Sequence, residues 1–311
     1  MKQAKDLRLK VKSWYLLTCL LAYSLTYCLY GSAGTTHGDF LKVPVGARAS
    51  AMGSAYTAVS DNAQATYWNP GGLTQMSNKN ISFTHLQYVS GIRYGDISFA
   101  MPVGGGKKRV YGAELNTLYT EDNRRDTTGN KIGEFMNYNS ALSVVCAEKL
   151  DENISCGISL KGIYLQLDDE QSGGVAVDCG ALYDTAKKMK FGIVLQNLGP
   201  KIKFVDESAP LAINIRCGVS YQINEKFLVA SDMMMPFEGA GTISVGCEYY
   251  VVKFLPVRVG YKYRSSGNNL GGLDGLSAGL GVSFKGYTLD YAFVPFGQFT
   301  NTHRFSFGMK F

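Results

Sequence analysis

Cysteine and histidine are the residues of this chain with the widest capacity for redox or metal chemistry. There are seven cysteines and three histidines, and no two cysteines have CxxC spacing. Cys19 and Cys28 lie in an apolar leading segment, whereas the others alternate with Val, Ile or Leu: Cys146, Cys156, Cys179, Cys217 and Cys247. We therefore expect these five cysteines to act as small apolar residues on the hydrophobic face of strands. We expect no metal site and no cofactor. Cys146 and Cys156 are symmetric about position 151, so the sequence also allows a disulfide between them across a hairpin.

Two other segments resemble catalytic motifs without their context. Gly104-Gly105-Gly106-Lys107-Lys108 lacks the spacing of a phosphate-binding loop and lies between two predicted strands rather than before a helix. The acidic run Asp168-Asp169-Glu170 falls in a predicted outer loop, with no second carboxylate cluster to act with it. No serine nucleophile motif occurs in the sequence. We expect a protein that is not an enzyme.

The net charge of the chain is concentrated at its start. The formal charge is +6, and residues 1–33 carry five of the cations and one anion, a balance of +4. The remainder is therefore only +2. A nucleic-acid-binding protein needs Lys and Arg clustered on one face, so the sequence does not favour nucleic acid as a partner.

Residues 1–33 have the layout of a secretory signal peptide. The basic start precedes the apolar stretch Trp14 to Tyr30 and the small-residue pattern Gly31-Ser32-Ala33, after which we expect cleavage. One alternative is an uncleaved anchor, although 17 residues are few for a hydrocarbon core about 30 Å thick. Another is a lipoprotein signal ending at Cys28, which the bulky Tyr27 disfavours.

From Asn80 onward, apolar and polar residues alternate with period 2, as in strands with one apolar face. Most of the runs have about the 9–11 residues that a tilted strand needs to cross a bilayer. We predict an all-β fold in which residues 80–311 form a transmembrane antiparallel β-barrel of about 14 strands. The predicted strands are 80–89, 92–102, 108–119, 136–148, 153–166, 174–185, 188–197, 211–223, 226–235, 240–252, 255–265, 273–285, 286–296 and 302–311.

The predicted connections are short after every even-numbered strand and mostly longer after odd-numbered ones, such as 122–135 and 198–210. Bacterial barrels alternate short periplasmic turns with longer outer loops, so both ends of the barrel should face the periplasm. The polar phase of the strands then faces the lumen and includes four cations: Arg216, Arg258, Lys262 and Arg264. A soluble sandwich would also alternate, but the signal, strand count and loop asymmetry favour a membrane barrel.

The last predicted strand has four apolar residues in one phase and finishes on an aromatic: Phe305, Phe307, Met309 and Phe311. This pattern resembles the signal by which outer-membrane barrels are recognised by their assembly machinery. A final strand of a soluble β-domain would not need to end on phenylalanine. We therefore expect the barrel-assembly machinery and outer-membrane lipid as partners.

Residues 34–79 do not alternate and are rich in Ala and Gly. Ala49, Met52, Gly53 and Tyr56 fall at helical spacing, and small residues elsewhere keep the segment thin enough for a narrow space. The sequence Asn69-Pro70-Gly71 predicts a turn. We assign 34–79 to a hatch segment that precedes the barrel.

The hatch carries a specific motif: Gly46-Ala47-Arg48-Ala49-x-Ala51-Met52-Gly53-x-Ala55, then Ala58-Val59-Ser60-Asp61-Asn62-Ala63-x-Ala65-x-Tyr67-Trp68-Asn69-Pro70-Gly71-Gly72-Leu73. It resembles the N-terminal signature shared by the long-chain fatty-acid transporter (FadL-type) barrels and their PorV/PorQ-like relatives. The family usually has Asn-Pro-Ala-Gly-Leu, and Gly71 replaces that alanine here. The phrase Leu195-Gln196-Asn197-Leu198-Gly199-Pro200 is similar to the PorV/PorQ-like and spirochaete-type branch.

The resemblance implies a 14-stranded barrel whose hatch blocks the lumen, and transport of long-chain fatty acids or similar hydrophobic molecules through a lateral gap in the wall. The hatch residues most able to line an apolar path, with the turn beside them, are Phe40, Leu41, Met52, Tyr56, Tyr67, Trp68, Asn69 and Pro70. The four lumenal cations can meet a carboxylate, but we favour their pairing with the lumenal acids Asp96, Glu114, Asp178, Glu248 and Asp290. The alternative function is a PorV-like partner or shuttle subunit of a protein secretion system.

Overall fold

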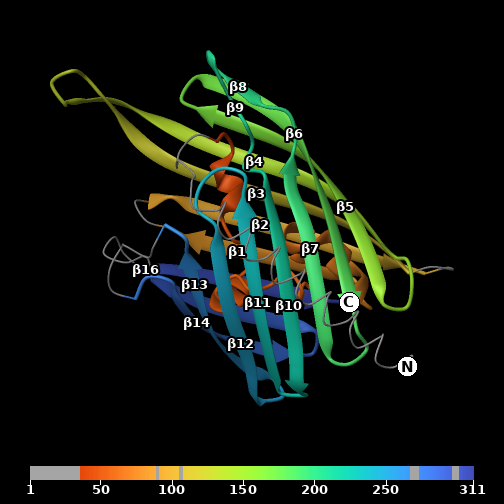
Figure 1. Ribbon diagram of the computed structural model, residues 1–311. Coiled ribbons are helices and arrows are strands. Elements are labelled where there is room, and N and C mark those ends of the chain that lie inside the picture. Colours follow the sequence, from red (N-terminus) through yellow and green to blue (C-terminus); the bar gives the residue numbers. More distant parts are fainter. Residues whose placement is uncertain (1–35, 89–90, 105–107, 267–272, 296–300) are drawn as a thin grey trace.

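The computed structural model describes residues 36–88, 91–104, 108–266, 273–295 and 301–311, and the predicted signal peptide lies outside this part of the chain. Fourteen antiparallel strands of the described residues close into one barrel, because β1 pairs with β16 as well as with β2 (Figure 1). The barrel strands are β1 (Asn80–Gln87), β2 (Arg93–Val103), β3 (Arg109–Arg125), β4 (Lys131–Lys149), β5 (Ile154–Leu167), β6 (Glu170–Asp184), β7 (Met189–Leu198), β10 (Asn214–Asn224), β11 (Phe227–Pro236), β12 (Thr242–Val252), β13 (Leu255–Arg264), β14 (Leu276–Phe284), β15 (Tyr287–Pro295) and β16 (Asn301–Lys310). The predicted fold class is confirmed.

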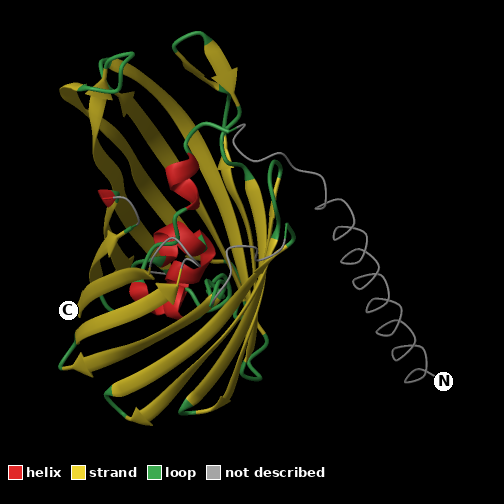
Figure 2. Cartoon of the chain, turned by 90° about the vertical axis from the view of Figure 1, so that its left-hand side faces the viewer, coloured by secondary structure: helices red, strands yellow, loops and turns green. Residues whose placement is uncertain are grey.

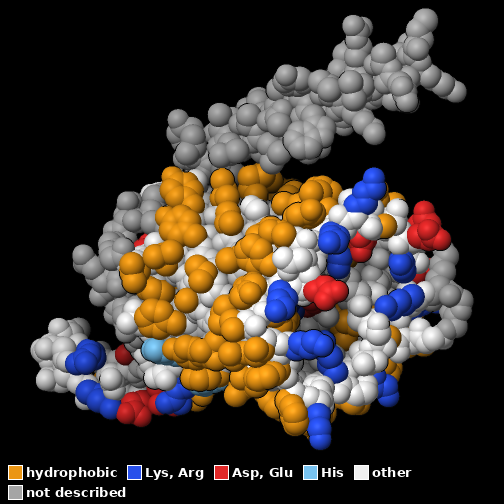
Figure 3. Space-filling model, turned by 90° about the horizontal axis from the view of Figure 1, so that it is seen from below, with side chains coloured by type: hydrophobic (Ala, Val, Ile, Leu, Met, Phe, Trp, Pro, Cys, Tyr) orange, Lys and Arg blue, Asp and Glu red, His pale blue; other side chains and the backbone are white. Residues whose placement is uncertain are grey.

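The alternating sequence places apolar residues outside and polar residues inside. On β13, Val257, Val259 and Tyr261 are exposed, whereas Arg258 and Gly260 between them are buried in the lumen. Hydrophobic side chains accordingly gather over much of the outer surface seen in Figure 3. Closure gives every strand a partner on both sides, which removes the open edge that lipid could not satisfy.

All five cysteines of the described residues are free and share the phase of the outward-facing apolar residues, as expected. Cys146 and Cys156 do not oppose each other: Cys146 pairs with Ile158, and Cys156 pairs with Glu148. The hairpin is therefore centred on residue 152 rather than 151. Because of this one-residue offset, the two cysteines are not cross-strand partners, and the disulfide that the sequence allowed does not form.

The connections differ from the prediction at one end of the barrel. Residues 122–135 were expected to form a loop, but β3 has 17 residues and β4 has 19, so their hairpin extends beyond the rim (Figure 1). A compact turn makes this extension favourable, because Asp126 Oδ1 accepts the N–H groups of Thr128 and Asn130 at 2.9 and 2.8 Å. Likewise, β5 and β6 continue to a turn at 168–169, and the expected loop 198–210 contains the hairpin β8 (Ile202–Phe204) and β9 (Glu207–Ala209).

Residues 36–79 fill the lumen (Figure 2). They form the short helices η1 (Asp39–Lys42), α2 (Ala47–Ala51), α3 (Ala65–Trp68) and η2 (Pro70–Gln75). The helical spacing from Ala49 to Tyr56 does not make one helix, because α2 ends at Ala51 and Gly53 adopts φ +65°. A Cβ at Gly53 would lie 2.8 Å from the backbone nitrogen of Tyr261, so close contact with the wall requires glycine there.

No helix among the described residues is long and apolar enough to cross a membrane. The two ends of the barrel meet at one rim, where the N–H of Phe311 donates to the carbonyl of Lys79 at 3.0 Å. We call this the short-turn rim and the opposite one the long-hairpin rim. On β16, Phe305 and Phe307 face outward, and Phe311, which follows the strand, is also exposed.

Candidate functional site

The centre of the lumen is an apolar cluster built from the hatch. Trp68 packs edge-on against Tyr56 and Tyr67, with ring centroids 5.9 and 5.1 Å apart. The indole N–H of Trp68 donates to the carbonyl of Val45 at 3.0 Å, and Met52 completes the hatch side of the cluster. All five side chains are at most 2% exposed. Four of the predicted path residues are therefore together, sealed inside the barrel.

The barrel wall carries glycines where the hatch touches it. A Cβ at Gly260 would lie 2.0 Å from the backbone nitrogen of Gly53, and one at Gly246 would lie 2.3 Å from the carbonyl oxygen of Met52. Similar contacts occur at Gly157, Gly180, Gly192 and Gly279. These distances are shorter than a carbon contact allows, so the hatch backbone occupies the space that side chains would otherwise fill.

The predicted turn residues fix the hatch against β5 and β6. Asn69 donates through its amide to the carbonyls of Thr57 and Ala181, both at 3.0 Å, and its oxygen accepts the N–H of Gly71. Pro70 lies against β5, where a Cβ on Gly157 would be 2.5 Å from its carbonyl carbon. Asn69 and Pro70 are therefore anchors of the hatch rather than part of the apolar cluster.

Arg48 is the centre of an ion network that joins the hatch to the wall formed by β12 to β15. It donates to both oxygens of Glu248 on β12 at 2.8 Å and to Asp61 of the hatch at 2.5 Å. Glu248 also accepts from Arg258 on β13, and Arg258 reaches Asp290 on β15, both at 2.6 Å. Positive and negative groups alternate along this buried chain, so each charge has a partner.

The environment of the hatch favours particular protonation states. Burial disfavours a charged guanidinium, but the carboxylates of Asp61 and Glu248 outweigh it and raise the pKa of Arg48 above its ordinary value. Burial raises the pKa of Tyr67 to about 12, and its hydroxyl donates to the carbonyl of Leu41 at 3.1 Å. Arg48 therefore stays charged, and Tyr67 stays a neutral donor, at physiological pH.

The four predicted lumenal cations lie in different environments. Arg258 belongs to the ion network, next to Glu248. Arg216 stacks on Trp68, with its guanidinium carbon 5.0 Å from the ring centroid, and donates to Gln196 at 2.8 Å. Lys262 and Arg264 instead line a cavity on the long-hairpin side of the hatch. The set therefore does not form one site.

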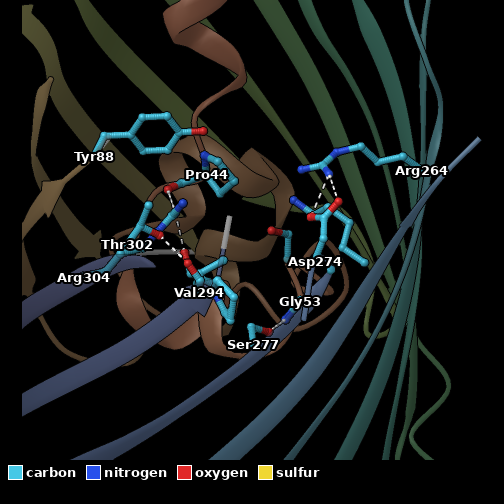
Figure 4. Close-up of a pocket in the computed structure, with 14 residues that line it drawn as sticks. Pro44, Gly53, Tyr88, Arg264, Asp274, Ser277, Val294, Thr302 and Arg304 are labelled. Atoms are coloured by element: carbon cyan, nitrogen blue, oxygen red, sulfur yellow. Dashed lines mark hydrogen bonds and ion pairs between the residues drawn. The ribbon is translucent and has the colours of Figure 1, made fainter. Parts of the chain in front are cut away.

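That cavity is small, with a volume of about 90 Å³, and charged, polar and apolar residues line it. Arg304 on β16 joins Lys262 and Arg264 in its lining (Figure 4). Arg264 donates to both oxygens of Asp274 at 3.2 and 3.3 Å, and Arg304 donates to the carbonyl of Pro44 at 2.7 Å. Three cations around one carboxylate leave an excess of positive charge, which suits an anionic group.

A second cavity of about 90 Å³ lies on the short-turn side and is lined by Arg48, Asp61, Asp290 and other polar residues. Helix α2 separates the two cavities, since Ser50 lines the first and Arg48 the second. The helix is held at both ends: Ser306 accepts the N–H of Ala47 at 2.8 Å, and Ser277 donates to the carbonyl of Ala51 at 3.0 Å. The hatch therefore closes the route between them.

Phe40 and Leu41 lie apart from the central cluster. They pack with Ile163, Leu165, Leu211 and other apolar residues of β4 to β6 and of the chain before β10. The N–H of His37 donates to the carbonyl of Pro210 at 2.9 Å, which ties the start of the described chain to this region. A second buried apolar cluster therefore lies near the long-hairpin rim.

Sequence reasoning missed three site residues. Arg48 and Asp61 are the only charged residues between Gly46 and Leu73, a signal that could have marked them as anchors. Arg304 lies between the outward phenylalanines of the last strand, in the lumenal phase, and could have been found from that phase. Among the described residues, no group of three or more His, Cys, Asp or Glu is placed to hold a metal ion.

Comparison with known proteins places this geometry in a known fold. The toluene transporter TbuX of Ralstonia pickettii matches with a TM-score of 0.61 at 14% identity, over 86% of this chain and 98% of that one. The Pseudomonas putida toluene transporter TodX matches at 0.59 and 12%, over 86% and 97%, and a Pseudomonas aeruginosa FadL homologue at 0.57 and 10%, over 86% and 98%. This chain has the FadL-type barrel fold.

At the level of sequence, no family model matches this chain, and a distant relative does. The UPF0164 protein of Treponema pallidum (strain Nichols) is 24% identical over 314 residues, which span 90% of this chain and 71% of the relative. The closed barrel and the buried N-terminal segment agree with the fold that the signature motif implied.

Proposed function

We propose that this chain transports hydrophobic molecules of the long-chain fatty-acid class across the outer membrane, without enzymatic activity. The main support is a FadL-type barrel whose lumen is closed by an apolar, firmly anchored hatch. Burying an acyl chain contributes about 0.8 kcal/mol per methylene, so a hydrophobic cargo favours apolar surfaces over a water-filled pore. The cleaved signal and the outward phenylalanines of β16 would deliver the chain to the barrel-assembly machinery.

We place the first contact with cargo at the long-hairpin side of the hatch. The buried apolar cluster around Phe40 and Leu41 would receive the hydrocarbon. On the same side of the hatch, the cavity lined by Lys262 and Arg264 would receive a carboxylate, and charge-assisted hydrogen bonds to a carboxylate are among the stronger polar contacts. Because Phe40 and Leu41 belong to the hatch, cargo bound in their cluster would displace hatch residues.

We place the lateral exit between β6 and β7. The pairing slips there: Val177 is opposite Leu198, whereas Cys179 is opposite Leu195. Asn197 occupies the bulge with φ +60°, and its N–H donates to buried Asp178 at 2.7 Å. Beyond Leu198, β6 has no barrel strand beside it. A bulge that ends strand pairing is a natural place for a wall to open.

Binding of a fluorescent long-chain fatty acid to the purified barrel tests the proposal. We expect saturable binding that weakens when Lys262 and Arg264 are both changed to glutamine, and loss of uptake when residues 34–73 are deleted. Lys310, which lines the short-turn cavity, provides the matched control: Lys310→Gln should leave binding unchanged. Absence of saturable binding by the wild-type barrel would overturn the proposal.

A staple across the proposed exit separates binding from release. Cysteines at positions 177 and 198, in a background without the native cysteines, should block uptake when crosslinked and leave fatty-acid binding intact. The control staple joins Leu289 and Phe307, which pair between β15 and β16. Equal uptake with both staples closed would place the exit elsewhere.

A PorV-like partner of a secretion system is the second candidate function. The observation in its favour is the β3–β4 hairpin, which extends beyond the rim and offers a surface outside the membrane. Such a protein should co-purify with large exported proteins under mild extraction and lose them when residues 122–135 are shortened. Recovery of the barrel alone would count against this function.

A further inference from the structure

Two acidic side chains face the lumen from adjacent strands, with part of their hydrogen bonding unmet. Asp96 on β2 is 2% exposed and Glu114 on β3 is 1% exposed. Ser98 donates to Asp96 Oδ1 at 2.9 Å, and Asn116 donates to Glu114 Oε1 at 3.3 Å. The other oxygens, Asp96 Oδ2 and Glu114 Oε2, have no hydrogen-bond donor among the residues that the structure describes.

The two acids are close neighbours on the lumenal face of β2 and β3. The register explains this, because Asp96 pairs with Asn116 while Ser98 pairs with Glu114, so the two acids are diagonal neighbours. Two carboxylates offer only acceptors and repel each other when both are ionised. They can form a hydrogen bond only if one of them carries a proton.

Other buried polar oxygens near the two acids also lack hydrogen-bond partners among the described residues. The oxygens of Asn116, Ser143 and Ser159 are buried and also lack a partner within the described part of the chain. Ser143 is directly opposite Glu114 in the β3–β4 register. Buried polar atoms of this kind are normally satisfied by water or an ion, so a proton or a water molecule would complete the hydrogen bonding of this region.

The charged and titratable groups around the pair come from several elements. Tyr94 on β2, Tyr67 on α3 and Lys161 on β5 lie nearest the pair, and Asp178 on β6, Arg216 on β10 and Arg304 on β16 lie beyond them, around Tyr67. Lys161 is 2.7 Å from Asp178, so part of its charge is already compensated.

We propose that Asp96 and Glu114 bind one proton between them and that this proton keeps the hatch seated against β2 and β3. The link to the hatch is Thr66 of α3, which packs against β3 at Gly112, two residues before Glu114. Its methyl group fits over Gly112, where a Cβ would lie only 2.9 Å away. When the pH rises and the proton passes to bulk water, the second negative charge forces the pair apart and loosens α3.

Infrared spectroscopy of the purified barrel tests the shared proton without any cargo. The wild type at neutral pH should show a protonated-carboxyl band that disappears as the pH rises. Asp96→Asn should remove the band, whereas Glu121→Gln, an exposed acid on the same strand as Glu114, should keep it. A wild-type spectrum without the band, or a band that persists in Asp96→Asn, would overturn the shared proton.

Ion conductance in planar bilayers tests the effect on the hatch. Openings of the wild type should become more frequent with pH, by up to about tenfold per pH unit across the titration. Asp96→Asn should stay closed, because its amide donates to Glu114 with no proton to lose. Glu114→Gln provides the reverse arrangement if the first variant does not fold. The same pH dependence in the wild type and in both variants would overturn the link to the hatch.

Discussion

The hatch meets two walls of the barrel in different ways. Against β11 to β16 it is held by a buried ion pair and by backbone hydrogen bonds: Arg48 binds Glu248 twice, and Asp232 accepts the N–H groups of Tyr56 and Thr57 at 3.0 and 2.8 Å. Against β2 to β4, around α3, the described residues form no such ion pair with the hatch, and several buried polar oxygens have no partner. The first wall anchors the hatch, so we expect movement to begin at the second.

The largest effect should come from breaking the anchored wall. Arg48→Gln leaves Glu248 and Asp61 without their shared partner, and loss of one member of a buried ion pair costs about 3–5 kcal/mol. We expect a lower urea midpoint for unfolding in detergent and a conducting pore. Arg109→Gln, which breaks the exposed pair with Glu148 at the rim, is the control and should change neither. Equal effects from the two variants would remove the distinction between anchor and rim.

An alkaline titration probes the hatch between the two walls. The pKa of Tyr67 is raised by burial from 10 to about 12, so its contribution to stability is fully present below pH 10 and is lost as the pH rises through about 12. The loss should be about 2–3 kcal/mol, which the urea midpoint across this range would report. Tyr67→Phe should lack that step. An identical alkaline step in the variant would assign it to another group.

A smaller effect should come from filling a contact of the anchored wall. Gly260→Ala puts a methyl group 2.0 Å from the backbone of Gly53, and overpacking of this kind costs about 1–3 kcal/mol. We expect raised conductance with the barrel still folded. Gly162→Ala on β5 is the control, since nothing lies within 4 Å of its added Cβ. Unchanged conductance of Gly260→Ala would show that the hatch tolerates displacement at this wall.

Much of the barrel could be predicted because its information is local. Period-2 alternation and short turns are visible within about ten residues, so strand number and the face of Arg258 followed directly. The length of the β3–β4 hairpin did not, because its outer half alternates weakly and depends on the turn at Asp126. The division of the cations between network, stacking and cavity depends on where the folded hatch contacts the wall. The pairing of Asp96 with Glu114 likewise depends on register, which period 2 alone leaves open.

The most direct test of the central claim compares ion conductance of the wild-type barrel with that of a barrel lacking residues 34–73. At neutral pH the wild type should be closed almost all the time, because α2 separates the two lumenal cavities. The deletion should give a steadily open pore. A wild type that conducts as steadily as the deletion would contradict a hatch that plugs the barrel.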